Sequence, residues 1–161
     1  MLKLIYLSLV CILVTSCSLD FSAPLAGPLL LNAQIRPKVA NEVIVAITNA
    51  NVERHLRSKF LDISKEFYSS LYSVEGYVGG SLRLEPFGNQ VWTLTIWKDK
   101  DALDRFALEQ PHMASIFSNS EGIIKSRSTS FAMKSKLVPE VWEKAIATLE
   151  KIPEQKNPDY F

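Results

Sequence analysis

His112 is the residue of this sequence best suited to chemistry, because it directly follows Pro111 at a break in an amphipathic helical stretch. Proline ends one helix and is well tolerated in the first turn of the next. If Pro111 starts a new turn, His112 lies at a helix N-terminus, where the helix dipole favours a neutral imidazole. A neutral imidazole can bind iron or accept a proton. The alternative is that Pro111 ends the helix at a surface corner and His112 only caps it.

The remaining polar residues form no other catalytic pattern. His55, the only other histidine, lies among Arg54, Arg57 and Lys59 on the solvated side of a predicted helix, and we assign it no chemical role. Two histidines far apart in the chain provide no zinc ligand set, so no metal site is expected. Neither a nucleophile elbow nor a phosphate-binding glycine loop is present. With 18 basic and 17 acidic residues and no basic stripe, nucleic acid is not an expected partner.

The N-terminus has the features of an export signal. Lys3 precedes an apolar run, Leu4 to Val14, that is too short to span a bilayer and is typical of a secretory signal peptide. The run ends in Val14-Thr15-Ser16-Cys17, which resembles the bacterial lipoprotein processing box. Residues 1–16 are therefore predicted to be removed, leaving a lipid-modified Cys17 as the new N-terminus. The alternatives are a secreted protein with a free Cys17, and a retained interfacial anchor.

Lipidation at Cys17 implies a location in the bacterial cell envelope, with the membrane as a partner through the acyl chains. By the same resemblance Ser18, which is not the aspartate associated with inner-membrane retention, allows transport to the outer membrane, facing the periplasm. The other cysteine, Cys11, lies in the discarded segment, so the mature chain has no disulfide. It would carry 17 basic and 17 acidic side chains, because only Lys3 is lost among the charged residues.

The mature chain is predicted to consist of a tether over 17–41, one domain over 42–152 and a loose tail over 153–161. The tether contains Pro24, Gly27, Pro28 and Pro37, although Leu29–Leu31 is apolar enough to dock on the domain. Within the domain, the spacing of apolar residues predicts strands and helices in alternation. The strands are expected over 43–47, 77–85, 90–97 and 125–137, and the helices over about 56–75, from Asp99 or Asp101 to Gln110, and from Pro139 to Leu149.

This order of elements is that of an α+β, ferredoxin-like βαββαβ fold with an added C-terminal helix. In the third strand, Trp92, Leu94 and Ile96 point to one face, whereas Thr93 and its alternating neighbours point to the other. Gly79-Gly80 marks a bulge or a close backbone approach. An antiparallel sheet with helices on one face leaves the other face bare, and a small monomer is expected to bury such a face. A homodimer follows from this expectation.

The stretch from about Glu42 to Leu137 resembles the antibiotic-biosynthesis-monooxygenase-like group of dimeric α+β barrels. The resemblance rests on Gly76-Tyr77-Val78-Gly79-Gly80, on Trp97 just before Asp99-Lys100-Asp101-Ala102-Leu103, and on Phe106 followed by Pro111-His112-Met113. The order of these residues is similar to that of a branch that includes carotenoid monooxygenases of the spheroidene type.

The resemblance implies a pocket between the helices and the sheet. Some members of the group oxidise aromatic substrates without a cofactor, and others bind or degrade haem. By this resemblance His112 matches the histidine of the haem-degrading members, and Asn49, expected at the end of the first strand, matches their asparagine more loosely. Trp97 is the candidate match for their tryptophan. That tryptophan lies in a helix in those members, whereas Trp97 is expected in a strand.

The sequence therefore predicts a lipid-anchored envelope protein with a monooxygenase-like domain that binds a small hydrophobic or haem-like ligand. His112 would be an axial ligand or proton acceptor, and Trp97 and Asn49 would shape the cavity. The competing hypothesis is a module without catalysis, which uses the barrel for dimerisation or for carrying a ligand. The residues identify no substrate and no electron donor.

Overall fold

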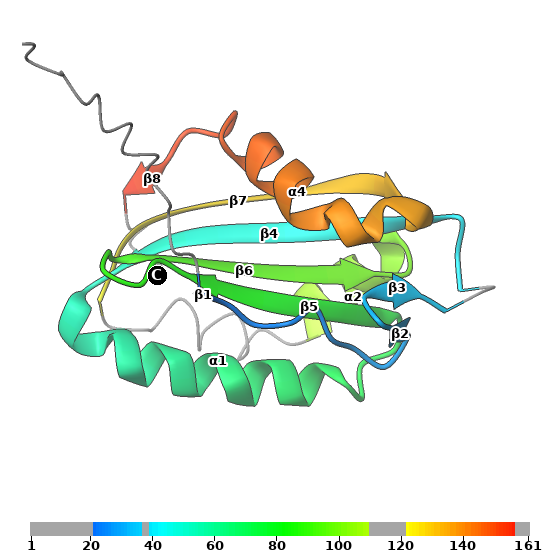
Figure 1. The fold of residues 1–161 in the computed structure, drawn as a ribbon, viewed down its shortest axis with the longest axis horizontal. Coiled ribbons are helices and arrows are strands. Elements are labelled where there is room, and N and C mark those ends of the chain that lie inside the picture. Colours follow the sequence, from blue (N-terminus) through cyan, green and yellow to red (C-terminus); the bar gives the residue numbers. More distant parts are fainter. Residues whose placement is uncertain (1–20, 37–38, 110–121, 157–161) are drawn as a thin grey trace, which may run out of the picture.

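A computed structural model describes residues 21–36, 39–109 and 122–156. His112, Pro111 and Cys17 lie outside these ranges, so the predictions for them stay predictions. The centre of the described domain is an antiparallel six-stranded sheet with the order β1-β5-β6-β4-β7-β8 (Figure 1). Its strands are β1 (Phe21–Ser22), β4 (Glu42–Val52), β5 (Tyr77–Leu84), β6 (Gln90–Trp97), β7 (Ile123–Lys134) and β8 (Gln155–Lys156). A separate hairpin pairs β2 (Leu30–Leu31) with β3 (Gln34–Ile35).

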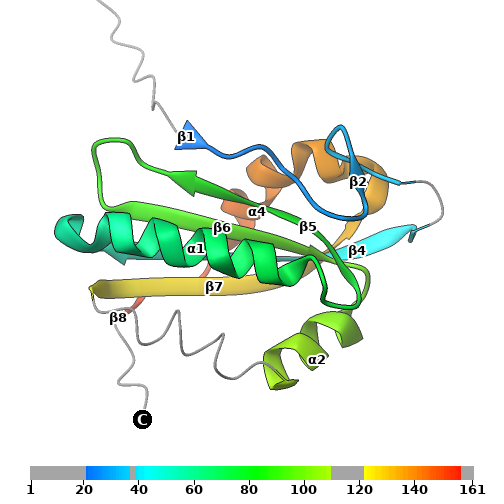
Figure 2. The same ribbon diagram turned by 90° about the horizontal axis from the view of Figure 1, so that it is seen from below.

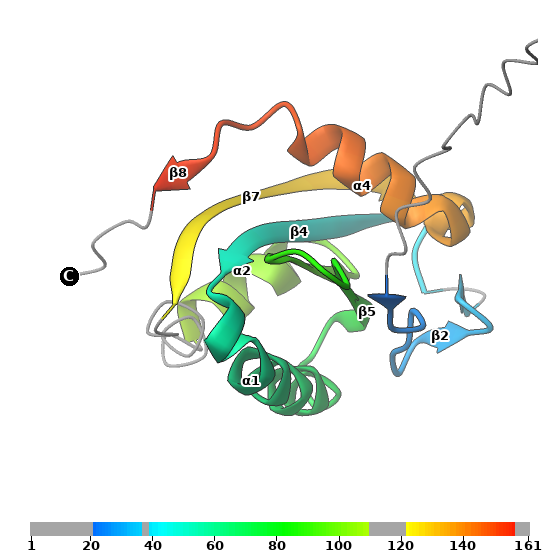
Figure 3. The same ribbon diagram turned by 60° about the vertical axis from the view of Figure 1, so that its left-hand side comes forward.

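The helices lie on both sides of this sheet. Their bounds are η1 (Arg54–Leu56), α1 (Arg57–Leu71), α2 (Lys100–Glu109), η2 (Ser135–Glu140) and α4 (Val141–Leu149), where η marks a 3₁₀ helix. Figure 3 shows the layers from the end of the sheet, with α1 and α2 on one face and α4 on the other. The central strands and the helices confirm the predicted α+β, ferredoxin-like fold with an added C-terminal helix.

Local sequence explains most element boundaries. Phe60, Phe67 and Leu71 are buried along one side of α1, as their spacing requires. The carboxylate of Asp99 accepts a hydrogen bond from the backbone N–H of Ala102 (2.8 Å), so it caps α2 as predicted. The sequence prediction differs for Pro139, which lies inside η2 rather than in the first turn of α4. The first strand is also longer than predicted, because β4 continues to Val52.

The pleat of β4 divides the sheet into two faces. Val43, Val45 and Ile47 point to the side that we call the α4 face, where they pack with Val141, Ala145 and Leu149. The alternating residues of β4 point to the opposite side, which we call the two-helix face. Ala50 and Val52 are buried there against α1. The same alternation places Leu94 and Ile96 on the α4 face and Trp97 on the two-helix face.

The α4 face is not bare, which corrects the argument that led to a homodimer. Val138, Val141, Ala145 and Leu149 are each at most 1% exposed against the sheet. Leu30, from the N-terminal hairpin, completes the cover and is 8% exposed. The added C-terminal helix and the N-terminal segment thus bury the apolar surface that was expected to need a second copy.

Residues 21–36 belong to the folded domain, and this corrects the prediction of a tether that extends to residue 41. The backbone of this segment bonds to β5 from Ala23 N–H to Leu82 O (2.8 Å) and in both directions between Ala26 and Gly80 (3.0 and 2.8 Å). Gly79 permits the close approach, because a Cβ there would lie 2.3 Å from Leu30 Cδ1. Part of Leu29–Leu31 docks as predicted, because Leu30 is buried while Leu31 stays exposed. We call residues 21–36 the N-terminal arm.

The C-terminal tail is also partly ordered. Residues 155–156 form β8 on the edge of β7, where Lys125 pairs with Lys156. An ion pair between the Lys125 ammonium and the Glu154 carboxylate (2.5 Å) lies beside this pairing. In the part of the chain that is described, residues 153–156 are therefore attached to the domain and do not form a loose tail.

Candidate functional site

On strands β6, β4 and β7, the middle of the two-helix face carries small side chains. Two neighbouring rungs of the sheet contribute them, and we call this group the central strip. In the strip, Ala46 pairs with Thr95 and Ser130, and Thr48 pairs with Thr93 and Ser128. Ala46, Thr48, Thr93 and Thr95 are half-buried, and Ser128 and Ser130 are exposed. The hydroxyls of Thr48 and Ser128 share a hydrogen bond of 3.0 Å.

Hydrophobic clusters flank the central strip at both ends. One cluster joins Phe60 of α1 to Ala50, Val52, Leu84 and Val91 of the sheet. The other joins the sheet to both helices through Phe67, Leu71, Tyr77, Trp97 and Ala102. The described part of this face thus has an apolar boundary at each end and a floor of hydroxyl and methyl groups, which suits a small ligand with few polar atoms.

Trp97 forms the aromatic boundary next to the central strip. Its side chain is fully buried, and its ring lies 4.9 Å from the ring of Phe106 on α2 and 5.5 Å from that of Tyr77. The indole N–H donates to the hydroxyl of Thr95 (2.9 Å), which belongs to the strip. Trp97 therefore positions a strip hydroxyl and packs against α2, the helix that leads toward Pro111 and His112.

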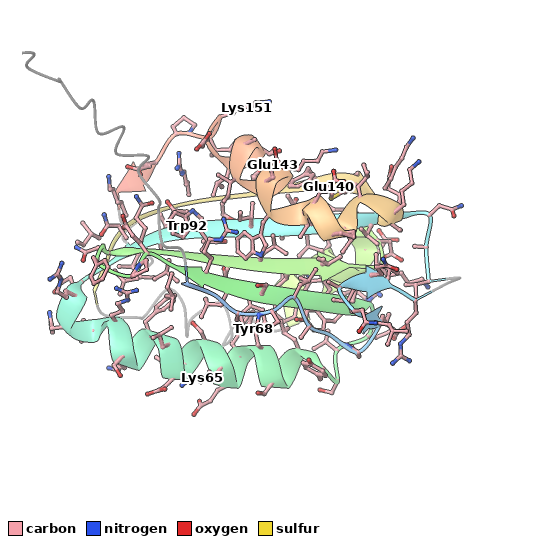
Figure 4. All side chains as sticks on the ribbon, viewed as in Figure 1. Lys65, Tyr68, Trp92, Glu140, Glu143 and Lys151 are labelled. Carbon is pink, nitrogen blue, oxygen red and sulfur yellow. The ribbon has the colours of Figure 1, made fainter. Side chains whose placement is uncertain are left out.

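Tyr68 projects from α1 into the same space. Its hydroxyl donates to the carbonyl of Ser81 (2.7 Å) and accepts from the N–H of Leu94 (3.1 Å), so it bridges β5 and β6. Figure 4 shows Tyr68 between α1 and the sheet, whereas Lys65 of the same helix points away. Gly80 makes room for this bridge, because a Cβ there would lie 2.6 Å from the Tyr68 ring and 2.6 Å from the Leu94 carbonyl oxygen.

Burial determines the protonation of the two phenols on this face. Removal from water raises the pKa of Tyr68 far above its ordinary value, an effect that its hydrogen bond with Leu94 only partly offsets. Burial likewise raises the pKa of Tyr77, whose hydroxyl has no hydrogen-bond partner within the described chain. Both side chains are neutral at physiological pH, so neither is a base.

Asn49 lies on the other side of the sheet from Trp97. It is well inside β4 rather than at its end, and it is 3% exposed on the α4 face. Its amide N–H groups donate to the Gln90 side-chain oxygen (3.1 Å) and to the Val91 carbonyl (3.2 Å). The structure therefore does not bring Asn49 and Trp97 into one cavity. Asn49 lies five positions after Ile44, the partner of Trp97, and side chains at an odd offset along a strand point to opposite faces.

Around Asn49, the α4 face has a polar and aromatic end that the sequence analysis missed. Trp92 pairs with Asn49 across β4 and β6, and Arg127 pairs with it across β4 and β7. The guanidinium of Arg83 lies 4.6 Å from the ring centre of Trp142 on α4. Figure 4 shows Trp92 on the same side of the sheet as α4. The signal was present in the sequence as polar residues at alternate positions near the ends of three predicted strands.

A pocket of about 530 Å³ lies elsewhere, between the N-terminal hairpin and η2. Its lining includes Arg36, Lys134 and Lys136, with the polar side chains of Gln34, Asn41 and Ser135. This basic and hydrophilic lining does not suit an apolar ligand. Among the described residues, no three side chains of histidine, cysteine, aspartate or glutamate gather to hold a metal ion. No helix within the same ranges is long and apolar enough to cross a membrane.

Together these features define an antiparallel α+β domain of the ferredoxin-like class, with a small-residue strip under two helices. No protein-family model and no curated protein matches the sequence. Among solved structures, an anthrone oxidase-like protein is 13% identical with a TM-score of 0.53, over 72% of this chain and 56% of that one. A conserved protein from Methanosarcina mazei is 20% identical with a TM-score of 0.50, over 61% and 97%.

A third similar structure is a Fusobacterium nucleatum protein provisionally described as a monooxygenase. It is 14% identical with a TM-score of 0.50, and the match covers 60% of this chain and 46% of that one. The chain thus spans about half the length of this protein and of the anthrone oxidase-like protein. These comparisons show that the chain has a monooxygenase-like fold.

Proposed function

We propose that this domain binds a small hydrophobic ligand on the central strip and acts on it as a monooxygenase-like protein. The observation that carries the proposal is the strip itself, where half-buried small side chains lie between two hydrophobic clusters. An ordinary core would fill this position with large aliphatic residues. The fold shared with an anthrone oxidase-like protein supports an aromatic ligand.

Within this proposal, His112 is the proton acceptor and Trp97 forms one boundary of the ligand site. The strip carries hydroxyls, and the two phenols beside it, Tyr68 and Tyr77, are neutral, so we assign the role of base to a residue elsewhere in the chain. Trp97 contributes by holding the Thr95 hydroxyl in place. Asn49 is not part of the proposed site, because it lies on the opposite face.

Haem is a poorer fit to the described residues than a neutral aromatic ligand. A haem needs an axial ligand and partners for its propionates. The strip contains no imidazole and no cationic side chain, and the Tyr68 hydroxyl already bridges two strands. We therefore assign no step of the chemistry to haem, and His112 as its axial ligand stays a prediction to be tested.

The second candidate is a module that carries a ligand without transforming it. The observation in its favour is the composition of the strip, which has only methyl and hydroxyl groups and so no side chain that exchanges protons near pH 7. In this case the hydroxyls of the strip only orient the ligand, and His112 has no chemical role.

One binding experiment tests the location of the site. The fluorescent probe N-phenyl-1-naphthylamine should bind to the purified protein, and Thr93→Phe should abolish binding by filling the strip. The matched control is Thr129→Phe, which adds the same side chain to the α4 face, since Thr129 pairs with Ile47. Equal loss in both variants, or no loss in either, would contradict the proposed location.

A second experiment separates the two functions. Haemin is titrated into the wild-type protein and into His112→Ala while the Soret band is followed. A shift that depends on His112 supports iron ligation, and binding that is indifferent to the substitution excludes it. An aromatic substrate consumed by the wild-type protein but not by His112→Ala supports catalysis, whereas binding without turnover in both favours the carrier.

We further propose that the protein is lipid-anchored through Cys17 in the cell envelope, in the outer membrane and facing the periplasm. The processing box at residues 14–17 supports this. Mass spectrometry of the mature protein should find an acylated Cys17, and Cys17→Ser should abolish labelling with a fatty-acid analogue. Membrane association that persists in Cys17→Ser would show instead that the N-terminal segment is retained.

A homodimer stays a prediction, and the structure narrows the surface that it can use. The central part of the α4 face is occupied by α4 and the N-terminal arm, so a partner has to bind at the polar end of that face or outside it. Sedimentation of the wild-type protein checks the oligomeric state.

A further inference from the structure

The turn between β5 and β6 presents an exposed aromatic side chain at one end of the domain. Phe87 is 83% exposed, the largest exposure among the large hydrophobic side chains of the described chain. It lies at the tip of the turn formed by residues 85–90, beside the start of α1 (Figure 2). A single exposed phenylalanine is common on protein surfaces and does not by itself indicate a partner. What distinguishes Phe87 is the structure of its turn and its position relative to the N-terminus.

Two arginines hold this turn in one shape. The Arg57 guanidinium donates to the carbonyls of Pro86 (3.2 Å), Gly88 (3.0 Å) and Glu85. Arg54 donates to the carbonyl of Phe87 itself (3.0 Å). These bonds satisfy the carbonyl groups of the turn inside the protein. Because unsatisfied backbone carbonyls are costly to bring into an apolar phase, a turn with satisfied carbonyls can approach a lipid surface at low cost.

The N-terminal arm enters the domain at the same end. β1 is antiparallel to β5, and Phe21 pairs with Leu84, three residues before Phe87. Cys17 precedes Phe21 by four residues, which span at most about 14 Å when fully extended. A lipid on Cys17 therefore cannot lie farther than this from the end of the sheet that carries the Phe87 turn. The docked N-terminal arm leaves no long tether that would let the domain move away.

The charges of this end are compatible with a headgroup layer. This end of the chain carries basic side chains at Arg54, Arg57 and Lys59 and acidic ones at Glu53 and Glu85. The His55 imidazole lies 3.3 Å from the Glu53 carboxylate. The two guanidinium groups stay bonded to the turn, and their positive charge next to an aromatic residue is compatible with nearby phosphates while the ring enters the interface. The balance is close to neutral, so the aromatic ring rather than net charge would dominate the contact.

We propose that the Phe87 turn is a membrane-docking tip, which inserts the ring into the interface of the bilayer that holds the Cys17 lipid. This inference rests on the proposed lipid anchor. Its partner is a phospholipid surface, and its consequence is an orientation in which α2 and the basic pocket lined by Lys134 and Lys136 face away from the membrane. Figure 1 shows α2 at the end of the sheet opposite the β5–β6 turn.

The test uses the mature acylated protein in phospholipid vesicles. Phe87→Cys is labelled with a polarity-sensitive fluorophore, and Leu108→Cys, which is 80% exposed on α2 at the other end, is the matched control. Cys17 does not react with the label once its thiol is in a thioether. The label at position 87 should shift its emission to the blue, be quenched by lipids with a shallow nitroxide, and be protected from iodide in the water. The label at position 108 should show none of these changes.

Each other outcome overturns a specific part of the proposal. If mass spectrometry finds acylated Cys17 but the label at position 87 stays in water, the docking tip is wrong and the anchor stands. If Cys17 carries no acyl chain, the anchor is wrong and the docking proposal is withdrawn with it. If both labels enter the lipid, the proposed orientation is wrong. Zwitterionic and anionic vesicles should give the same shift, and a shift confined to anionic vesicles would show that the arginines rather than Phe87 make the contact.

Discussion

Replacing Tyr68 by phenylalanine should destabilise the fold, although the substitution removes a single oxygen atom. The hydroxyl accepts from the Leu94 N–H at 3.1 Å and donates to the Ser81 carbonyl at 2.7 Å. Both backbone groups lie between paired strands, where water cannot replace the phenol. Without the hydroxyl, a donor and an acceptor are left unsatisfied inside the protein.

Leaving a buried polar group unsatisfied costs about 1–3 kcal/mol. Two such groups, partly relieved by local adjustment of the strands, give an expected loss of about 2–4 kcal/mol in the free energy of unfolding. A loss of this size is a large fraction of the total for a domain of this length, which is about 5–15 kcal/mol. With a urea m-value of about 2 kcal/mol/M, the unfolding midpoint should fall by about 1–2 M.

Urea unfolding followed by far-UV circular dichroism measures this difference. The control is Tyr72→Phe, which removes the same atom from a side chain that is 51% exposed, and it should change stability by less than about 0.5 kcal/mol. If Tyr68→Phe has the same midpoint as Tyr72→Phe, then β5 and β6 close to form a direct bond. That result would refute the argument that the hydroxyl is a necessary bridge.

Three further predictions use other parts of the structure. Leu149→Ala, at a fully buried position of α4, should lower the free energy of unfolding in urea by about 2–5 kcal/mol. A decrease of less than about 1 kcal/mol would show that α4 is not firmly packed on the sheet. Burial raises the pKa of Tyr68 and Tyr77 in the folded state, so their contribution to stability is complete below the pKa of an unfolded tyrosine, about 10, and decreases above it by about 1.4 kcal/mol per pH unit for each group. The free energy of unfolding, measured between about pH 9 and 11, should therefore fall less steeply with pH in Tyr77→Phe than in the wild-type protein. Lys125→Met should raise the pKa of Glu154, which its hydrogen bond with Lys125 lowers, and an unchanged carboxyl titration by NMR would show that the pair does not form in solution.

The fold was predictable because its signals are local. The spacing of Phe60, Phe67 and Leu71 predicts an amphipathic helix, and the alternation of Trp92, Leu94 and Ile96 predicts a strand. Asp99 is an ordinary helix cap at the expected position. The turn at residues 86–89 determines that β5 and β6 are neighbours. These features depend only on residues close together in the sequence.

The errors concern residues whose surroundings come from distant parts of the chain. Residues 21–36 were assigned to a tether because of their prolines, although docking of the leucines was expected. Leu30 is buried because Gly79, 49 positions away, leaves space for it. The α4 face was expected to be bare because the sequence does not show on which side of the sheet the last helix packs. Asn49 and Trp97 were grouped by family resemblance, whereas the length of β4 and its pleat place them on opposite faces.

The N-terminal arm also closes one border of the sheet. Its backbone bonds to β5 at three successive places, through the carbonyls of Leu82, Gly80 and Val78. Cleavage by a protease within residues 23–29 would therefore do more than separate the domain from the chain that precedes it. It would uncover a row of unpaired amides and carbonyls along β5, a surface that recruits strands from other chains. The cleaved protein should therefore aggregate under conditions in which the intact chain does not.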